Sequence, residues 1–137
     1  MNRKLPVTEI MTTDLITLHP EDSLNIVEQT FASKTFHHIP IVSADNEIMG
    51  MVSKTDLLQI SAIRREFSEK DFKYIKVKDF MTREVYVAHP ESTLEQVAAI
   101  FNENKFHAIP IVEGSKVIGI VTTQDVIRAA FELEPVS

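Results

Sequence analysis

The chain has 137 residues, 44% of them hydrophobic and 25% charged, with a net charge of −6 and no cysteine. This composition is typical of one globular domain and excludes a disordered tail, a collagenous fibre and a coiled-coil rod. The missing cysteines exclude disulfides and thiolate metal sites, and the acidic balance argues against general nucleic-acid binding. Since no apolar run reaches the about 18 residues of a spanning helix and residues 1–6 lack the apolar stretch of a signal peptide, we expect a soluble, cytoplasmic protein.

A tandem duplication organises the chain. Shifting the sequence by 70 positions aligns several segments with one another. The second repeat is one residue shorter in a later turn, so the offset is 69 after that turn. The aligned pairs are residues 7–12 with 77–82, 19–21 with 89–91, 36–42 with 106–112, and 50–53 with 119–122. We therefore predict two repeats, residues 7–60 and 77–132, joined by a connector at residues 61–76.

Each repeat begins with an extended stretch, residues 15–18 or 85–88, that is closed by a His-Pro pair. A helix follows, because apolar residues recur at steps of three and four. These residues are Leu24, Val27 and Phe31 in the first repeat and Leu94, Val97 and Phe101 in the second. Asp22 and Ser23 predict the start of the first helix, and residues 92–95 predict a capping box at the second.

Two compact apolar strands and a last helix complete each repeat. The strands are predicted at residues 39–42 and 48–52, and again at 109–112 and 117–121, with polar or glycine turns between them. The last helices begin near Ser53 and Thr122. The order strand, helix, strand, strand, helix predicts an α/β (α+β) fold of two tandem β-α-β-β-α repeats. Since about fifty residues are marginal alone, we expect the copies to share one core.

The segment around the connector is basic in an otherwise acidic chain. Residues 61–80 hold six basic and four acidic side chains. A solvated tether is the plain interpretation. The alternative hypothesis is that Arg64, Arg65 or Lys70 contacts the outer phosphates of a bound polyanion, because clustered positive charge favours such a group.

The joints between the last strand and the last helix carry the most informative residues. Ser53 and Asp56 are spaced as a helix cap and its partner, and so are Thr122 and Asp125. One interpretation is a capping-box variant that only stabilises the helix. The other is a ligand site, since a helix N-terminus with a hydroxyl attracts phosphate and a carboxylate one turn later can accept hydrogen bonds from a ribose. We expect Gly50 and Gly119, at the other end of the strand, to serve the preceding turn.

The two Ile-Pro strands and the two Gly-x-x-Ser/Thr-x-x-Asp joints resemble tandem cystathionine-β-synthase (CBS) domains over nearly the whole chain. The resemblance implies a Bateman module, in which two repeats related by a pseudo-twofold axis enclose two clefts. It also implies adenosine ligands such as AMP, ADP, ATP or S-adenosylmethionine. In that family the aspartate holds the ribose, the hydroxyl residue meets the phosphate, and residues before the motif proline flank the base.

Transferred to this sequence, the resemblance gives two sets of ligand-binding residues. The first set is Ile16, His38, Pro40, Ser53, Lys54 and Asp56. The second set is Tyr86, Ala108, Pro110, Thr122, Thr123 and Asp125. Because His38 matches Ala108, Lys54 matches Thr123 and Ile16 matches Tyr86, the two sites are predicted to differ in ligand or affinity.

The remaining residues indicate no catalysis. The five histidines follow the duplication and lack the spacing of metal ligands, and no nucleophile motif surrounds the serines. We therefore expect no enzyme, no catalytic cofactor and no metal. We expect a stand-alone adenosine-nucleotide sensor that acts on an unidentified partner protein and forms a homodimer through the apolar faces of the first helices. The alternative is a ligand-free CBS module for interaction or dimerisation.

Overall fold

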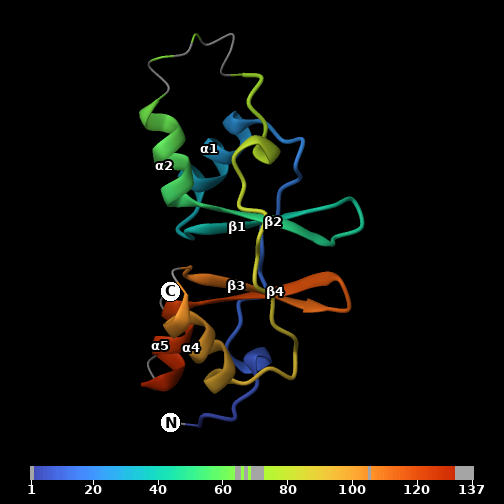
Figure 1. Ribbon diagram of the computed structural model, residues 1–137, viewed down its shortest axis with the longest axis vertical. Helices are drawn as coiled ribbons and strands as arrows, with labels where there is room; N and C mark the ends of the chain where they lie inside the picture. The colour runs from blue at the N-terminus through green and yellow to red at the C-terminus, as the bar shows by residue number, and fades with distance from the viewer. Residues whose placement is uncertain (1, 64–65, 67, 69–72, 105, 132–137) are drawn as a thin grey trace. The chain divides into compact units, whose positions relative to one another are not determined.

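The computed structural model describes residues 2–63, 66, 68, 73–104 and 106–131 (Figure 1). The chain divides into two compact units. We call residues 16–85 the central unit, and residues 1–15 together with 86–137 the split unit. Residues 7–15 of the first repeat thus belong to the split unit, and residues 77–85 of the second repeat belong to the central unit.

The central unit contains an antiparallel hairpin with two helices on the same face (Figure 1). The helices are α1 (Leu24–Ser33) and α2 (Lys54–Ala62), the strands are β1 (His38–Val42) and β2 (Ile48–Ser53), and a short 3-10 helix is η3 (Val77–Asp79). The hairpin turn places Asn46 at φ 64°, a left-handed conformation that asparagine tolerates well.

The split unit repeats this arrangement with other residues. The helices are α4 (Leu94–Glu103) and α5 (Thr123–Ala130), the strands are β3 (Ala108–Glu113) and β4 (Lys116–Thr122), and the 3-10 helix is η1 (Val7–Glu9). Here the hairpin turn uses Gly114 at φ 63°. The mixed α/β fold with strand–strand–helix units predicted from the sequence is confirmed.

The first predicted strand of each repeat is much reduced. Only Leu18 and Ala88 form bridges there, each parallel to one residue of the adjacent hairpin, Ile41 or Ile111. In each unit another segment also pairs with the hairpin, which the sequence did not predict. Thr82 forms an antiparallel bridge with Met51, and Thr12 forms one with Ile120; we call these the crossing segments. Isolated bridges of this kind leave too few repeated contacts for a strand pattern to show in the sequence.

Each unit has its own cluster of buried apolar residues, which replaces the single core expected from the sequence. Ile39 and Ile41 belong to the cluster of the central unit, and Ile109 and Ile111 belong to that of the split unit; all four are fully buried. The apolar faces of α1 and α4 cover these clusters, with Leu24, Val27, Leu94 and Val97 at most 2% exposed. Those faces therefore cannot form the dimer surface that we expected of them.

The glycines of β2 and β4 permit a close crossing of chain segments. A Cβ atom on Gly50 would lie 2.8 Å from the carbonyl oxygen of Thr82, and one on Gly119 would lie 2.6 Å from the Met11 sulfur. The expectation that these glycines serve the hairpin turn is wrong, because their missing side chains make room for the crossing segments.

The helix caps follow the sequence with one shift. Ser23 caps α1 as predicted. At α4 the capping box joins Thr93 and Gln96, whereas Ser92 and Glu95 were predicted. Ser92 instead accepts a hydrogen bond from the His89 amide at 3.0 Å, so the hydroxyl is committed to the turn before the helix.

Candidate functional site

The strand–helix joint of the central unit is held by a reciprocal pair of hydrogen bonds. The Asp56 amide donates to Ser53 Oγ at 3.0 Å, and the Ser53 amide donates to Asp56 Oδ2 at 2.9 Å. This capping box satisfies two donors at the start of α2. The Ser53 hydroxyl retains its own proton, which is available to donate to an anion.

The joint of the split unit has the same geometry. The Asp125 amide donates to Thr122 Oγ1 at 3.2 Å, and the Thr122 amide donates to Asp125 Oδ2 at 2.9 Å. Asp125 is only 4% exposed, whereas Asp56 is half-buried. Both predicted capping boxes are thus confirmed. A ligand at either joint would bind the lone pairs of the carboxylate and the hydroxyl proton that the capping box does not use.

The first helical turns offer fewer free amides than a bare helix end. The Lys54 amide donates to the His37 carbonyl at 2.8 Å, and the Thr123 amide donates to the His107 carbonyl at 3.0 Å. The amide of the third helical residue, Asp56 or Asp125, donates to the cap hydroxyl. The amide of the second helical residue, Thr55 or Gln124, takes no part in the capping box. A phosphate here would depend on hydroxyl and side-chain donors as much as on the helix end.

The hairpins bring the residues around the motif prolines to these joints. His38 lies opposite Ser53 in the register of β1 and β2, and Ala108 lies opposite Thr122 in that of β3 and β4. Pro40 and Pro110 are buried two residues further along. Lys54 is exposed and Thr123 is half-buried at the first helical position. Each predicted set is therefore assembled within a single unit.

Ile16 and Tyr86 come from the segments that run parallel to β1 and β3. Because Leu18 pairs with Ile41 and Ala88 with Ile111, these segments carry Ile16 and Tyr86 toward the ends of the strands where the joints lie. The Tyr86 ring stacks on Phe106 with centroids 5.0 Å apart, and the residue remains 53% exposed. Only the split unit therefore has an exposed aromatic ring at this place.

An ion pair distinguishes the carboxylate of the split unit. Arg128 Nη2 binds Asp125 Oδ1, and the Arg128 side chain is 25% exposed. The sequence analysis missed Arg128, although its place three residues after Asp125 on a helix is the spacing at which side chains meet. In the central unit the matching residue is Gln59, and among the described residues Asp56 forms no ion pair.

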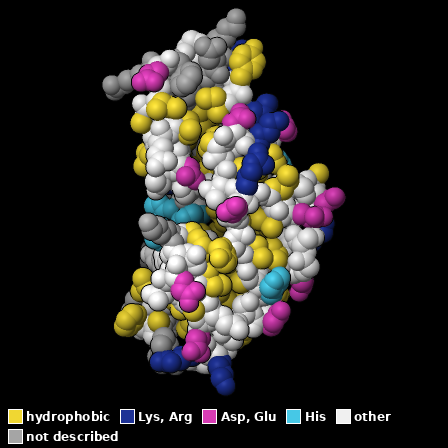
Figure 2. All heavy atoms as spheres, in the orientation of Figure 1, with side chains coloured by type: hydrophobic (Ala, Val, Ile, Leu, Met, Phe, Trp, Pro, Cys, Tyr) yellow, Lys and Arg dark blue, Asp and Glu magenta, His cyan; other side chains and the backbone are white. Residues whose placement is uncertain are grey.

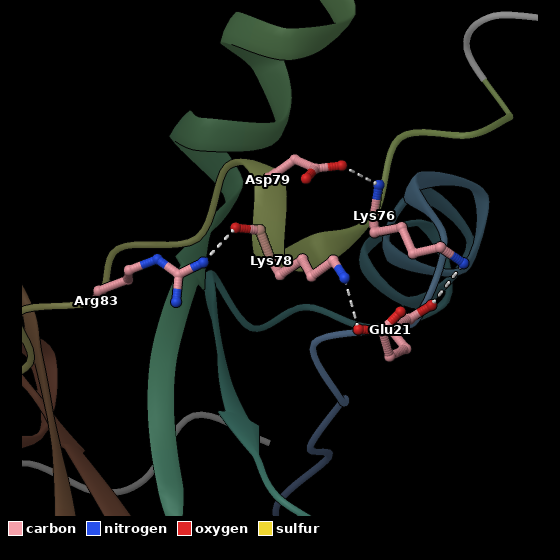
Figure 3. Close-up of polar contacts among 5 residues, drawn as sticks. All are labelled: Glu21, Lys76, Lys78, Asp79 and Arg83. Atoms are coloured by element: carbon pink, nitrogen blue, oxygen red, sulfur yellow. Dashed lines mark hydrogen bonds and ion pairs between the residues drawn. The ribbon is translucent and has the colours of Figure 1, made fainter.

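Two lysines near the end of the connector, Lys76 and Lys78, bind Glu21 of the central unit (Figure 3). Lys78 Nζ lies 2.8 Å from Glu21 Oε1, and Lys76 Nζ donates to the Glu21 carbonyl at 3.4 Å. The hydrogen bond from Lys78 lowers the pKa of Glu21, and the same bond raises the pKa of Lys78. Arg64, Arg65 and Lys70, the predicted phosphate contacts, lie outside the described residues.

The histidines do not gather as metal ligands. Across the described part of the chain, no three of the His, Asp and Glu side chains come close enough together to hold a metal ion. His19 Nδ1 instead donates to the Val42 carbonyl at 2.9 Å, which ties the His-Pro turn to β1. Within the same described ranges, no helix is long and apolar enough to cross a membrane.

Comparisons with known proteins agree with this architecture. The family described as CBS domain matches residues 7–63 and 77–132. Protein MJ1225 of Methanocaldococcus jannaschii is 30% identical over 123 residues, which are 90% of this chain and 42% of that protein. The chain spans less than half the length of the curated relatives it matches.

Two solved structures of similar length contain adenosine compounds. CBSX2 of Arabidopsis thaliana in complex with AMP is 27% identical, with a TM-score of 0.81 over 93% of this chain and 97% of that chain. The CBS domain pair of protein MJ0100, in complex with methylthioadenosine and S-adenosylmethionine, is 25% identical, with a TM-score of 0.78 over 91% of this chain and 98% of that chain.

Proposed function

Because this chain belongs to the CBS domain family, we propose that it is a regulatory module that binds an adenosine ligand and controls a partner protein. The ligand class is AMP, ADP, ATP or S-adenosylmethionine. The observation that carries the proposal is the pair of matching joints, each with a hydroxyl and a carboxylate held one helical turn apart. The adenosine compounds in CBSX2 and in the MJ0100 pair support this ligand class.

In the proposed complex the carboxylates of Asp56 and Asp125 accept hydrogen bonds from ribose hydroxyls. The hydroxyls of Ser53 and Thr122 donate to the phosphate, and Lys54 adds a positive charge in the central unit. The exposed ring of Tyr86 offers a face for adenine in the split unit. The remaining members of each set, Ile16, His38 and Pro40 or Ala108 and Pro110, border the base.

The test is thermal unfolding and calorimetry with AMP, ADP, ATP and S-adenosylmethionine. A ligand at 100 times its Kd stabilises the folded chain by about 2.7 kcal/mol, which raises the Tm. Asp56→Asn and Asp125→Asn keep a capping acceptor but remove the charge, so each is expected to abolish binding in its own unit. Thr93→Ala is the matched control, because it removes a cap outside both sites. If no ligand changes the Tm or releases heat, the nucleotide-sensor proposal is wrong.

One observation favours the alternative, a module that serves interaction or dimerisation. Leu58 on α2 and Ile127 on α5 occupy matching positions and are 62% and 52% exposed. Apolar side chains are visible at the surface over both helices (Figure 2). We propose a homodimer that buries these two residues, because closed twofold pairing is the commonest way to cover such a surface. A monomer mass of the wild type at tens of micromolar, measured by light scattering, would contradict this, and Leu58→Glu/Ile127→Glu is expected to give the monomer.

A further inference from the structure

The carboxylates of Asp56 and Asp125 differ in the groups that already bind them. At Asp125 the Thr122 amide donates to Oδ2 at 2.9 Å, and Arg128 binds Oδ1. Both oxygens of this carboxylate thus have a partner, and the residue is 4% exposed. At Asp56 the Ser53 amide donates to Oδ2, and the residue three positions later is the uncharged Gln59.

A ribose diol binds a carboxylate by donating its protons to the oxygens. At Asp125 such a diol competes with Arg128, whose side chain reaches Oδ1 from the next turn of α5, and the burial of this carboxylate leaves little room for both. A guanidinium cannot lose its charge in a protein, so a second anion near Arg128 favours its release from Asp125. A ligand with a phosphate supplies that anion, whereas methylthioadenosine, which carries no anionic group, does not.

We propose that Arg128 determines the specificity of the split unit, admitting phosphorylated adenosine ligands and rejecting uncharged ones. The inference rests on the proposed nucleotide binding and names the ligand class of one of its two sites. The site in the central unit, with Gln59 at this position, accepts both classes. The two capping boxes are alike, so the predicted difference in ligand between the two sites comes from Arg128.

The experiment uses the full chain with one site disabled. In the Asp56→Asn background, calorimetry reads the split unit alone, with AMP and methylthioadenosine as the two probes. Arg128→Gln is expected to strengthen methylthioadenosine binding about tenfold, because the competing charged hydrogen bond is gone. The same variant is expected to leave AMP binding unchanged or weaker, so the AMP preference falls at least tenfold. Arg128→Lys keeps the charge and is expected to restore part of the preference.

A reciprocal variant and a control complete the test. In the Asp125→Asn background, Gln59→Arg installs the cation beside Asp56 and is expected to lower methylthioadenosine affinity about tenfold relative to AMP. Arg83→Gln removes a cation of the central unit without touching either carboxylate and is expected to change neither ratio. If AMP binds but Arg128→Gln leaves the ratio unchanged, the role of Arg128 is refuted and the proposed function stands. If the wild type binds neither probe nor ADP, ATP or S-adenosylmethionine, the proposed function itself fails.

Discussion

In the central unit Lys76 and Lys78, at the start of η3, both bind Glu21. In the split unit the positions matching these lysines are Pro6 and Thr8, and the ion pair lies on α5 instead, where Arg128 binds Asp125. The backbone around these positions is nevertheless the same. The Val77 amide donates to the Asp22 carbonyl at 2.9 Å, and the Val7 amide donates to the Ser92 carbonyl at 2.8 Å.

The comparison teaches that the duplicated backbone is maintained by buried apolar residues, caps and backbone hydrogen bonds, which both units share. The charged side chains are free to differ, because surface ion pairs contribute little to stability. A cation beside a nearly buried carboxylate has a larger consequence, since it changes what that carboxylate can bind. The units therefore diverge in ligand chemistry without diverging in fold.

The largest expected effect tests the crossing segments. Gly50→Ala places a Cβ atom 2.8 Å from the Thr82 carbonyl oxygen, which is fixed by a 2.9 Å hydrogen bond from the Met51 amide. Gly119→Ala instead meets the Met11 sulfur at 2.6 Å, at the end of a flexible side chain, and the Thr12 oxygen only at 3.2 Å. We expect losses in the free energy of unfolding of about 3 kcal/mol and about 1 kcal/mol, measured by urea unfolding.

A second substitution checks the reason for this difference. Met11→Ala is expected to relieve the cost of Gly119→Ala, because it removes the crowded side chain. Met81→Ala should not relieve Gly50→Ala, since the backbone oxygen remains in place. Two outcomes would contradict this explanation: equal losses of unfolding free energy for Gly50→Ala and Gly119→Ala, or a smaller loss in both units after the methionine is removed. Either would show that the Thr82 carbonyl oxygen does not make Gly50→Ala the more destabilising substitution.

The sequence predicts the local elements well and their assembly less well. The hairpins, the helices and the caps at Ser23, Ser53 and Thr122 follow from apolar periodicity and from short-range hydrogen bonds, which are encoded within a few residues. The exchange of residues 1–15 and 77–85 between the repeats depends on contacts with segments far along the chain. No local pattern records such contacts, so the separate cores of the two units were missed.

The candidate sites show the same division. The spacing of hydroxyl and carboxylate predicts the reciprocal hydrogen bonds, because both partners lie within one helical turn. The Tyr86–Phe106 stack joins residues 20 positions apart, and only the fold reveals it. Arg128 was overlooked for a different reason: its spacing from Asp125 is visible in the sequence, but the burial that makes the pair matter is not.

An intermediate effect tests whether the caps are equivalent. Ser53→Ala and Thr122→Ala each remove one reciprocal hydrogen bond, and each is expected to cost about 1 kcal/mol of unfolding free energy. Ser23→Ala is expected to cost only a few tenths of that, because the Ile26 amide approaches Ser23 Oγ at 3.4 Å. Thermal unfolding without ligand measures all three. A much larger loss for one joint would show that its hydroxyl supports more than the helix end.

The smallest expected effect concerns the Glu21–Lys78 pair, which only the central unit has. Both side chains are exposed, so Lys78→Gln should lower the Tm slightly, and high salt should reduce the difference.

The pKa of Glu21 lies below its usual value of 4.5, so this contribution is present above that pH and is lost as pH falls through the lowered pKa. The pKa of Lys78 lies above its usual 10.5, so the contribution also disappears as pH rises through the raised value. Thr8 matches Lys78 and Glu91 matches Glu21 in the repeat, so Thr8→Lys is expected to form the corresponding pair and to raise the Tm over the same pH window. A Tm difference for Lys78→Gln that persists in strong acid would show that Lys78 acts through packing, and the charge contrast between the units would then not extend to this pair.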